Sequence, residues 1–389
     1  MSRIVNGRVW VPVGVVGVVI AGMTALAGPI NPPVGPVAST FKTLSEVEPR
    51  IAINATNTPG DATSLFKITQ PGSYYLTGNI TGVVGKHGIA IAAGGSGVTL
   101  DLMGFDLVGV AGSLDGVSVT VVGLTNIAVV NGSVRNWGDE GVDLASVGPT
   151  NNCRVEGVLA SGNTGSGISA GNASTVTNCS AYLNTGNGIS AVSGCTISNC
   201  SAYNNTGNGI TTGSGCTVSN CSANQNTGTG IIVSSGSSSS TVSNCSAFQN
   251  AASGISVSTG GTAADCTARF NTLDGIVCNA ACMIRGNTCS SNGFNGDGAN
   301  IHATAGANRI EGNTCTGADR GIDVDAAGNF IIKNTCKANT IDWVIAANNT
   351  YGPIIDRRIP SPIASTPAVS GTSAASTLGT TDPNANFTY

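Results

Sequence analysis

A Gly-Ile dipeptide returns at nearly constant intervals along the chain, and this repeat constrains the fold more than any other feature. The glycines of its clearest copies are Gly167, Gly188, Gly209, Gly230, Gly254, Gly275 and Gly321. Most intervals are 21 residues, one is 24, and the last is 46 because it spans a divergent copy at Asn300 and Ile301. Such a period indicates a repeat architecture, in which each unit buries its apolar face only against its neighbours.

Each repeat unit predicts three short strands with a bend at every corner. In residues 188–202, GISAVSGCTISNCSA, Ile189 and Ala191 alternate with polar residues, which is the period of two typical of a half-buried strand. A second strand turns Ile197 inward, and a third turns Cys200 inward. The same register extends towards both ends of the chain. We therefore predict an all-β, single-stranded right-handed parallel β-helix, or solenoid, of about 12 turns with an N-terminal cap.

The composition excludes several other classes of protein. Hydrophobic residues make up 41% of the chain, which is too many for a disordered protein. The 55 glycines, together with abundant Ser, Thr and Asn, disfavour long helices. Only 9% of the residues are charged and the net charge is -4, so we expect no basic surface for nucleic acid.

The two ends of the chain differ from the repeat region. Residues 1–27 combine a positively charged start, a short apolar run and Ala-Leu-Ala at 25–27, which predicts a cleaved secretory signal peptide. An uncleaved membrane anchor is the alternative. Residues 28–80 are expected to form a linker and cap, 81–355 the β-helix, and 356–389 a low-complexity, flexible or loosely docked tail. No later segment is apolar enough over a sufficient length to span a bilayer, so we expect a secreted or cell-envelope protein.

Stacking places equivalent residues of successive coils above one another. Asn178, Asn199, Asn220 and Asn244 share one corner, where asparagine accepts a left-handed backbone and can form a ladder of amide hydrogen bonds. One inward position is assigned to eight cysteines, namely Cys179, Cys200, Cys221, Cys245, Cys266, Cys289, Cys315 and Cys336. A second inward column holds Cys153, Cys195, Cys216 and Cys282.

We interpret both cysteine columns as buried thiols that act as small hydrophobic side chains. The chain has 13 cysteines, an odd number, so complete internal pairing is impossible. Scattered disulfides, with Cys278 and Cys282 as the first candidates, are one alternative. A metal site is the other, although the columns lack the C-x-x-C spacing of zinc sites.

Charged residues are confined to the two ends of the repeat region. Residues 157–264 contain no Asp, Glu, Lys, Arg or His, so the central coils lack the paired carboxylates of glycoside hydrolysis and a base for proton abstraction. Before this stretch, Asp115, Asp139, Glu140 and Asp143 lie on neighbouring turns and are candidate oxygen ligands for Ca²⁺. No other cofactor is expected.

A second charged group follows the uncharged stretch. It comprises Asp274, Asp297, His302, Asp319, Arg320, Asp323 and Asp325. The register places His302 directly beneath Asp323, and a histidine–carboxylate pair beside Arg320 is an acid/base arrangement. We therefore name His302, Arg320 and Asp323 as candidate catalytic residues. The alternative is a solvated face that keeps a sparsely charged rod soluble.

Three aromatic residues, Tyr182, Tyr203 and Phe248, share an outward repeat position. Stacked, exposed aromatic rings can bind the faces of sugars or a protein partner, so these three are candidate ligand-binding residues. Packing beneath a neighbouring loop is the alternative.

Three stretches of sequence resemble a known family. They are PGSYYLTGNI at residues 71–80, NRIEGNTC at 308–315 and DRGIDVDAAGNFIIKNTC at 319–336. With the coil pattern, they make residues 60–355 resemble the right-handed parallel β-helix repeat proteins of the pectate-lyase-like superfamily, in particular exported bacterial members. The resemblance implies the fold but no single activity, since the superfamily includes lyases, hydrolases, epimerases, phage tailspikes and adhesins. The Asp-Asp pair and Arg-x-Lys motif of polygalacturonase-like members are absent from this sequence, so no family catalytic residue is carried over.

Three functions are compatible with this sequence. The first is an exported, non-catalytic cell-surface or envelope protein whose rigid rod presents a face to a polysaccharide or a surface protein. The second is a polysaccharide lyase or hydrolase with its site near residues 297–325. The third is a purely structural spacer. The absence of charge from the central coils favours the first.

Overall fold

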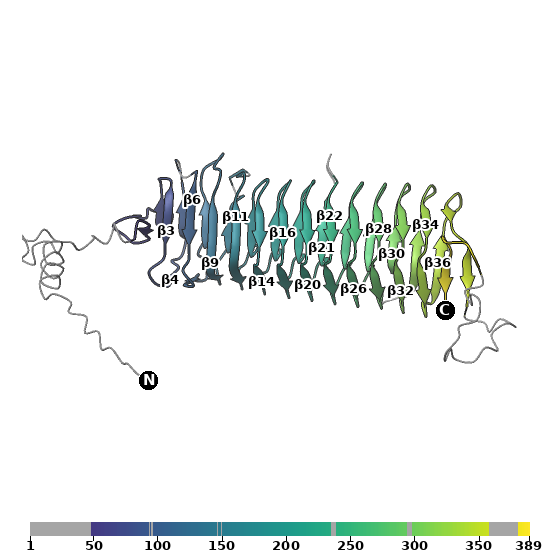
Figure 1. The fold of residues 1–389 in the computed structure, drawn as a ribbon. Coiled ribbons are helices and arrows are strands. Elements are labelled where there is room, and N and C mark those ends of the chain that lie inside the picture. The colour runs from purple at the N-terminus through teal and green to yellow at the C-terminus, as the bar shows by residue number, and fades with distance from the viewer. Residues whose placement is uncertain are drawn as a thin grey trace, which may run out of the picture. The chain divides into compact units, whose positions relative to one another are not determined.

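The structure is a computed structural model. It describes residues 48–357 and 380–389, apart from residues 93, 95, 146, 149, 235–238 and 294–297. The predicted signal peptide, most of the predicted tail and Asp297 therefore lie outside the described residues. Within them the chain forms only strands and turns, and no helix of the length and hydrophobicity needed to cross a membrane is found there. The strands stack as parallel rungs of a rod (Figure 1).

One face of the rod is a 13-stranded parallel sheet, called sheet B here, which takes one strand from each coil at the Gly-Ile position. Its strands, in order along the rod, are β2 (Ser64–Ile68), β5 (His87–Ile91), β8 (Val117–Val119), β10 (Val142–Asp143), β12 (Ile168–Ala170), β15 (Ile189–Ala191), β18 (Ile210–Thr212), β21 (Ile231–Val233), β24 (Ile255–Val257), β27 (Ile276–Cys278), β30 (Ala299–Ala303), β33 (Arg320–Val324) and β36 (Ile341–Ile345). At about 4.8 Å between neighbouring strands, this sheet is about 58 Å long.

The other two strands of each coil belong to a 26-stranded sheet, called sheet A, in two parallel columns. The second strand of each coil is one of β1 (Ile51–Ala52), β3 (Gly72–Tyr75), β6 (Val98–Asp101), β9 (Ala128–Arg135), β11 (Arg154–Ser161), β13 (Thr175–Thr177), β16 (Thr196–Ser198), β19 (Thr217–Ser219), β22 (Thr241–Ser243), β25 (Thr262–Ala264), β28 (Met283–Arg285), β31 (Arg309–Glu311), β34 (Phe330–Ile332) and β37 (Thr350–Tyr351). The third is one of β4 (Ile80–Thr81), β7 (Asp106–Val108), β14 (Ser180–Tyr182), β17 (Ser201–Tyr203), β20 (Ser222–Asn224), β23 (Ser246–Phe248), β26 (Thr267–Arg269), β29 (Thr288–Ser290), β32 (Thr314–Thr316), β35 (Thr335–Lys337), β38 (Ile354–Asp356) and β39 (Asn386–Thr388). The long strands β9 and β11 run through both columns. The predicted three strands per coil are confirmed.

The segment predicted as an N-terminal cap contains one further coil. Strand β2 pairs in parallel with β5, placing Phe66 opposite Ile89, and β3 pairs with β6. Tyr74 and Leu76 are buried in the core of this coil. Sheet B therefore has 13 strands against the 12 turns predicted. The strand β2, SLFKI, lacks the Gly-Ile pair, so counting that pair could not reveal it.

The inner columns of the core follow the predicted register. Ile168, Ile189 and Ile210 lie directly opposite one another in sheet B, and all three are fully buried. In sheet A, Val176 and Ile197 are paired in the same way. A continuous apolar core therefore runs along the rod, because each coil covers the apolar face of the next.

All 13 cysteines are buried and free, but the predicted column of eight is wrong for its last three members. The position of Cys266 is taken in the next coil by Asn287, whose Oδ1 accepts the backbone N–H of Cys266 at 2.9 Å. Cys289 instead lies opposite Ala268, and Cys315 and Cys336 follow it. A shift of two residues keeps a strand side chain on the same face, so an inward cysteine gives no sign of the change.

The continuous asparagine ladder lies at a different corner from the one predicted. Asn178, Asn199, Asn220 and Asn244 do have the expected left-handed backbone, with φ between 51° and 55°. The ladder, in which each Nδ2 donates to the next Oδ1 at 2.8–3.0 Å, consists of Asn163, Asn184, Asn205, Asn226, Asn250, Asn271, Asn292, Asn300 and Asn339. A Cβ on Gly188 would lie 2.7 Å from Asn205 Nδ2, so the ladder explains the glycine of the repeat.

Candidate functional site

The outward side chains that follow the inner residue of each strand of sheet B form one column along the rod. The pairing register gives this column as Lys67, Ala90, Ser118, Asp143, Ser169, Ser190, Thr211, Ile232, Ser256, Val277, His302, Asp323 and Val344. Both predicted charged groups therefore lie on the same face of the rod, on either side of an uncharged middle. Seven rungs of about 4.8 Å separate Asp143 from His302, a distance of about 34 Å.

The structure adds His87 to the predicted Ca²⁺ ligands Asp115, Asp139, Glu140 and Asp143, and these five residues are the N-terminal cluster. His87, Asp115 and Glu140 hold the same outward corner position in three consecutive coils. His87 Nδ1 lies 3.1 Å from Asp115 Oδ2. Asp115 Oδ1 accepts the backbone N–H of Glu140 at 3.1 Å, which fixes the carboxylate between the two neighbouring coils.

Sequence reasoning missed His87 as a member of this site. It lies 28 residues before Asp115, and distance along the chain gives no hint of their contact. The available signal was the repeat itself, since His87-Gly88-Ile89 and Asp115-Gly116-Val117 have the same form.

Three carboxylates of the N-terminal cluster converge. Asp115, Glu140 and Asp143 each place one oxygen within 4.8 Å of the others, and the residues Asp115 and Asp143 are each only 4% exposed. Burial, a hydrogen bond with Asp139 and the nearby negative charges raise the pKa of Glu140 from 4.5 to about 8. The cluster therefore holds a proton at neutral pH.

The same three carboxylates fit a hard cation such as Ca²⁺, which prefers oxygen ligands. Asp139 is exposed and lies outside the convergent set, so it is a neighbour of the proposed ligands rather than one of them. Cation binding here requires loss of the proton from Glu140, because a carboxylate binds metal in its ionised form. A cation bound here would therefore compete with the proton.

The N-terminal cluster lines a groove on the outer face of sheet B. One hollow of about 460 Å³ is bordered by His87, Asp115, Glu140 and Asp143 and ends at Ser169. A second hollow of about 500 Å³ is bordered by Asp61 and Lys67, and the two hollows share Thr120. The buried residues Ala90 and Ser118 lie between Lys67 and Asp143 in the outward column. The groove is predominantly acidic.

The predicted catalytic residues also meet, as the register implied. Asp274, His302, Arg320, Asp323 and Asp325 are the C-terminal cluster. His302 Nδ1 lies 3.2 Å from Asp274 Oδ2, and its Nε2 lies 3.0 Å from Asp325 Oδ2. Arg320 Nη1 donates to Asp323 Oδ2 at 2.7 Å, and the side chain of Asp323 is 2% exposed.

The pairing of charges determines what the C-terminal cluster can do. The hydrogen bond with Asp274, helped by that with Asp325 and opposed by burial, raises the pKa of His302 to about 9. His302 is therefore protonated at neutral pH and is not available as a general base. Its two carboxylate partners and the Arg320–Asp323 pair leave this cluster close to electrically balanced. This arrangement favours a structural role.

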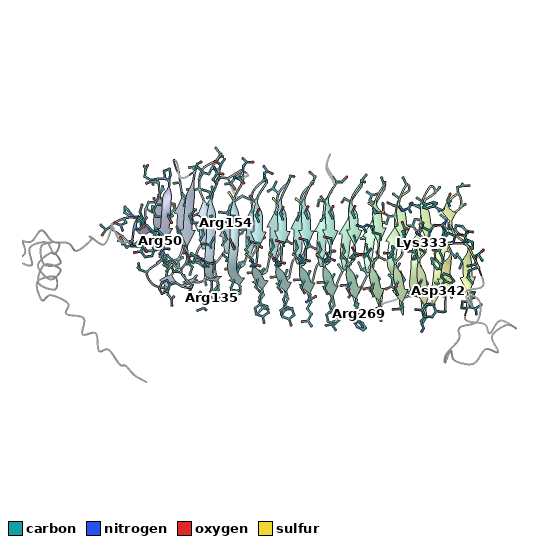
Figure 2. The ribbon with its side chains drawn as sticks, in the orientation of Figure 1. Arg50, Arg135, Arg154, Arg269, Lys333 and Asp342 are labelled. Carbon is teal, nitrogen blue, oxygen red and sulfur yellow. The ribbon has the colours of Figure 1, made fainter. Side chains whose placement is uncertain are left out.

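The aromatic candidates share their outward position in the structure, in the order Tyr182, Tyr203, Asn224, Phe248, Arg269. The rings of Tyr182 and Tyr203 stack at 5.4 Å and 14°. Asn224 separates them from Phe248, which instead makes an edge contact of 5.7 Å with Phe270. Arg269, labelled in Figure 2, marks the edge of the rod on which this row lies. Because each tyrosine ring covers one face of the other, less ring surface is open to a sugar.

Comparisons with known proteins agree with this architecture. A family described as "Right handed beta helix region" matches residues 115–273 and 194–308. The A-module of mannuronan C-5 epimerase AlgE6 from Azotobacter vinelandii superposes with a TM-score of 0.55 at 16% identity, over 77% of this chain and 86% of its own. The AlgE4 A-module gives 0.53 at 16% identity, over 78% and 88%. A mutant tailspike protein of E. coli bacteriophage HK620, in complex with a hexasaccharide, gives 0.52 at 13% identity, over 75% and 67%. No curated protein matches the sequence.

The coil geometry and these matches define a right-handed parallel β-helix protein. The chain has the fold of the pectate-lyase-like superfamily, as its sequence motifs implied. At identities of 13–16% the likeness shows the fold, and the activity has to be argued from the site.

Proposed function

We propose that the chain is an exported surface or envelope protein that binds a neutral polysaccharide in the groove on the outer face of sheet B. The groove is the observation that carries this proposal. Its lining residues come from five consecutive rungs, β2 to β12, so it extends over about 19 Å. Export is inferred from the signal-peptide pattern of residues 1–27.

The charge of the groove indicates the class of glycan. Ionised carboxylates accept hydrogen bonds from sugar hydroxyls but repel the carboxylates of uronic acids. Asp61, Asp115, Asp139 and Asp143 face only Lys67 and His87 as basic groups. The fold supports a carbohydrate ligand, since the tailspike was solved with a hexasaccharide and the A-modules belong to mannuronan C-5 epimerases. The acidic groove here predicts a preference for uncharged chains.

The test fills the groove and leaves the rest of the column intact. Ser169→Trp places a large ring at one end of the groove, whereas Ser256→Trp places it at the same outward position of β24, outside the groove. We expect wild type and Ser256→Trp to be retarded equally in affinity electrophoresis through neutral glycans, and Ser169→Trp to migrate freely. Equal retardation of both variants would place glycan binding elsewhere, and no retardation of the wild type would favour a spacer.

Glycoside hydrolysis is a second candidate, favoured by the state of Glu140. A carboxyl with a pKa of about 8 beside ionised carboxylates is the pattern of an acid next to a nucleophile. Oxygens of Glu140 and Asp143 lie within 4.8 Å, nearer to the about 5–5.5 Å of retaining enzymes than to the wider spacing of inverting ones. In this scheme Asp143 attacks the anomeric carbon while Glu140 protonates the glycosidic oxygen, so that the glycosidic C–O bond breaks and the alcohol departs. Water, deprotonated by Glu140, then hydrolyses the glycosyl ester of Asp143 and restores both carboxyl groups. The site of the enzyme hypothesis therefore moves from residues 297–325 to the N-terminal cluster.

A reducing-end assay on the same neutral glycans separates the two functions. Turnover by the wild type, lost in Glu140→Gln and kept in Asp274→Asn, would establish the enzyme. Binding without release of reducing ends would establish the binding protein.

A further inference from the structure

The last strand of the chain lies inside the stack rather than at its end. Strand β39 pairs in parallel with β35 on one edge and with β38 on the other. Strand β38 follows the last coil directly in the sequence, whereas β39 is reached only after residues 357–385. The C-terminal segment therefore fills a slot between two strands that both precede it in the chain.

The segment takes the positions of a repeat unit and repeats its asparagine. Asn386 lies at the position that follows Asn334 in its column, and its Oδ1 accepts the backbone N–H of Asn334 at 2.9 Å. Its Nδ2 donates to the carbonyl oxygens of Ile331 and Gly352, at 3.2 and 3.0 Å. Asn386 is fully buried.

The next inward residue of the segment is equally well accommodated. Thr388 pairs with Cys336 and is 1% exposed. Its Oγ1 accepts the indole N–H of Trp343 at 2.8 Å. Beyond it, the ring of Tyr389 lies under the ammonium of Lys337, 4.6 Å from the ring centre.

Main-chain contacts hold the segment on both sides. Towards β35, Phe387 N–H donates to the Asn334 carbonyl at 2.9 Å, and Tyr389 N–H donates to the Cys336 carbonyl at 3.2 Å. Towards β38, Asn386 N–H donates to the Pro353 carbonyl at 2.8 Å. The Asn384 carbonyl occupies the space that a Cβ on Gly352 would need, so only glycine leaves this side of the slot open.

We propose that the space between β35 and β38 is an exchangeable peptide-binding site, whose ligand is the extended C-terminal segment 384–389 of this chain. Binding is by strand addition, with main-chain hydrogen bonds for affinity and side-chain positions for Asn and Thr for selectivity. Exchange follows from the order of the chain. A strand delivered by a long connection can leave without unwinding the coils on either side, so its opening costs less than global unfolding. The site is independent of the glycan groove.

A full-length variant with a defective strand tests whether the slot accepts this peptide. Asn386→Lys combined with Thr388→Lys puts two charges at buried positions and keeps the chain's own segment out. A labelled peptide of residues 380–389 should bind this variant one to one. Its affinity for the wild type should be at least about ten-fold lower, because there the tethered segment competes at high effective concentration.

Two controls define specificity. Gly352→Ala, added to the double variant, should abolish peptide binding, and a peptide carrying Thr388→Lys should not bind the double variant. Equal binding to wild type and double variant, binding that survives Gly352→Ala, or no binding at all would each overturn the proposal.

Hydrogen exchange of the wild-type protein tests whether the strand leaves the slot without global unfolding, even if the double variant does not fold. The amides of Phe387 and Tyr389 should be protected, yet exchange faster than the amide of Thr335 in β35, which donates to Asn313. Exchange at the Thr335 rate would mean that the strand leaves only when the rod unfolds. Exchange at the rate of a free peptide would mean that the slot does not hold it. Either result contradicts the proposal.

Discussion

The two charged clusters are built on one local plan and reach opposite electrostatic states. In each, an aspartate two residues before the inner residue of sheet B accepts an N–H from the next coil and meets a histidine. Asp115 contacts Glu140 N–H and His87, and Asp274 contacts Ala299 N–H and His302. At the C-terminal end His302 and Arg320 offset two of the three carboxylates, whereas at the N-terminal end four acidic groups face one histidine and share a proton. Similar residues thus give a nearly balanced set of charges in one place and an acidic groove in the other.

Removal of the cation paired with Asp323 is the most direct test of this difference between the clusters. Arg320→Ala leaves a carboxylate whose side chain is 2% exposed without its ion pair, and the free energy of unfolding should fall by about 3 kcal/mol. Urea unfolding at pH 7 measures this change.

Arg269→Ala is the matched control, because this exposed arginine donates to a surface serine and lies over the exposed ring of Phe270, so its loss should cost under about 1 kcal/mol. Equal losses from the two substitutions would show that the C-terminal cluster is no more than a solvated face.

The two clusters should lose their contributions to stability over different pH ranges. Both pKa values are raised, so each group stabilises the fold in its protonated form and loses that contribution as pH rises. The contribution of Glu140 is complete below about 4.5 and lost through about 8, and that of His302 is complete below about 6.5 and lost through about 9. Urea midpoints at pH 5, 7 and 9.5 measure both declines.

Glu140→Gln should reduce the fall of the urea midpoint between pH 5 and 7. His302→Gln should reduce its fall between pH 7 and 9.5. An unchanged profile in His302→Gln would remove the argument that this histidine is held protonated.

Calcium should sharpen the difference, since the N-terminal cluster has the larger excess of carboxylates over cationic side chains. Because Ca²⁺ competes with the Glu140 proton, it should raise the melting temperature more at pH 9 than at pH 6. At ten times its Kd a ligand contributes about 1.4 kcal/mol. Differential scanning fluorimetry with and without Ca²⁺ measures the shift.

Asp143→Asn should eliminate the calcium effect, while Asp325→Asn at the other cluster should leave it unchanged. A shift that is independent of pH, or that persists in Asp143→Asn, would rule out the three-carboxylate site.

The smallest effect concerns the aromatic row, which lies on sheet A away from both clusters. Tyr203→Ala should remove the stack with Tyr182 and cost about 1 kcal/mol of stability, without changing retardation by neutral glycans. Loss of glycan binding in this variant would transfer the binding surface from the groove to the aromatic row.

The fold was largely predictable because the repeat fixes register. Once Ile189 and Ile210 are aligned, the strands, the inner columns and the contact of His302 with Asp323 all follow. The sequence did not reveal the places where the repeat is interrupted while the pattern of inward-facing residues continues. The two-residue shift at Cys289 and the irregular first coil at β2 are such cases.

The site was only partly predictable for a related reason. Register shows which side chains are neighbours, but the raised pKa of Glu140 depends on burial and on surrounding charges in three dimensions. The docking of the C-terminal strand was missed because its unit, Asn386-Phe387-Thr388, lacks the cysteine and glycine that mark other coils.

The asparagine ladder gives the rod a property that neither cluster has. From Asn184 to Asn271 every amide of the ladder donates to the next coil and accepts from the previous one. Asn300 then links Asn292 to Asn339, and Trp137 N–H and Asp342 close the two ends. The hydrogen-bonding pattern of these regular repeats does not depend on how many repeats there are. Duplication of one 21-residue segment would lengthen the rod by about 4.8 Å and leave both ends chemically intact. Evolution can thus adjust the distance between the groove and the C-terminal strand in steps of one coil, about 4.8 Å each.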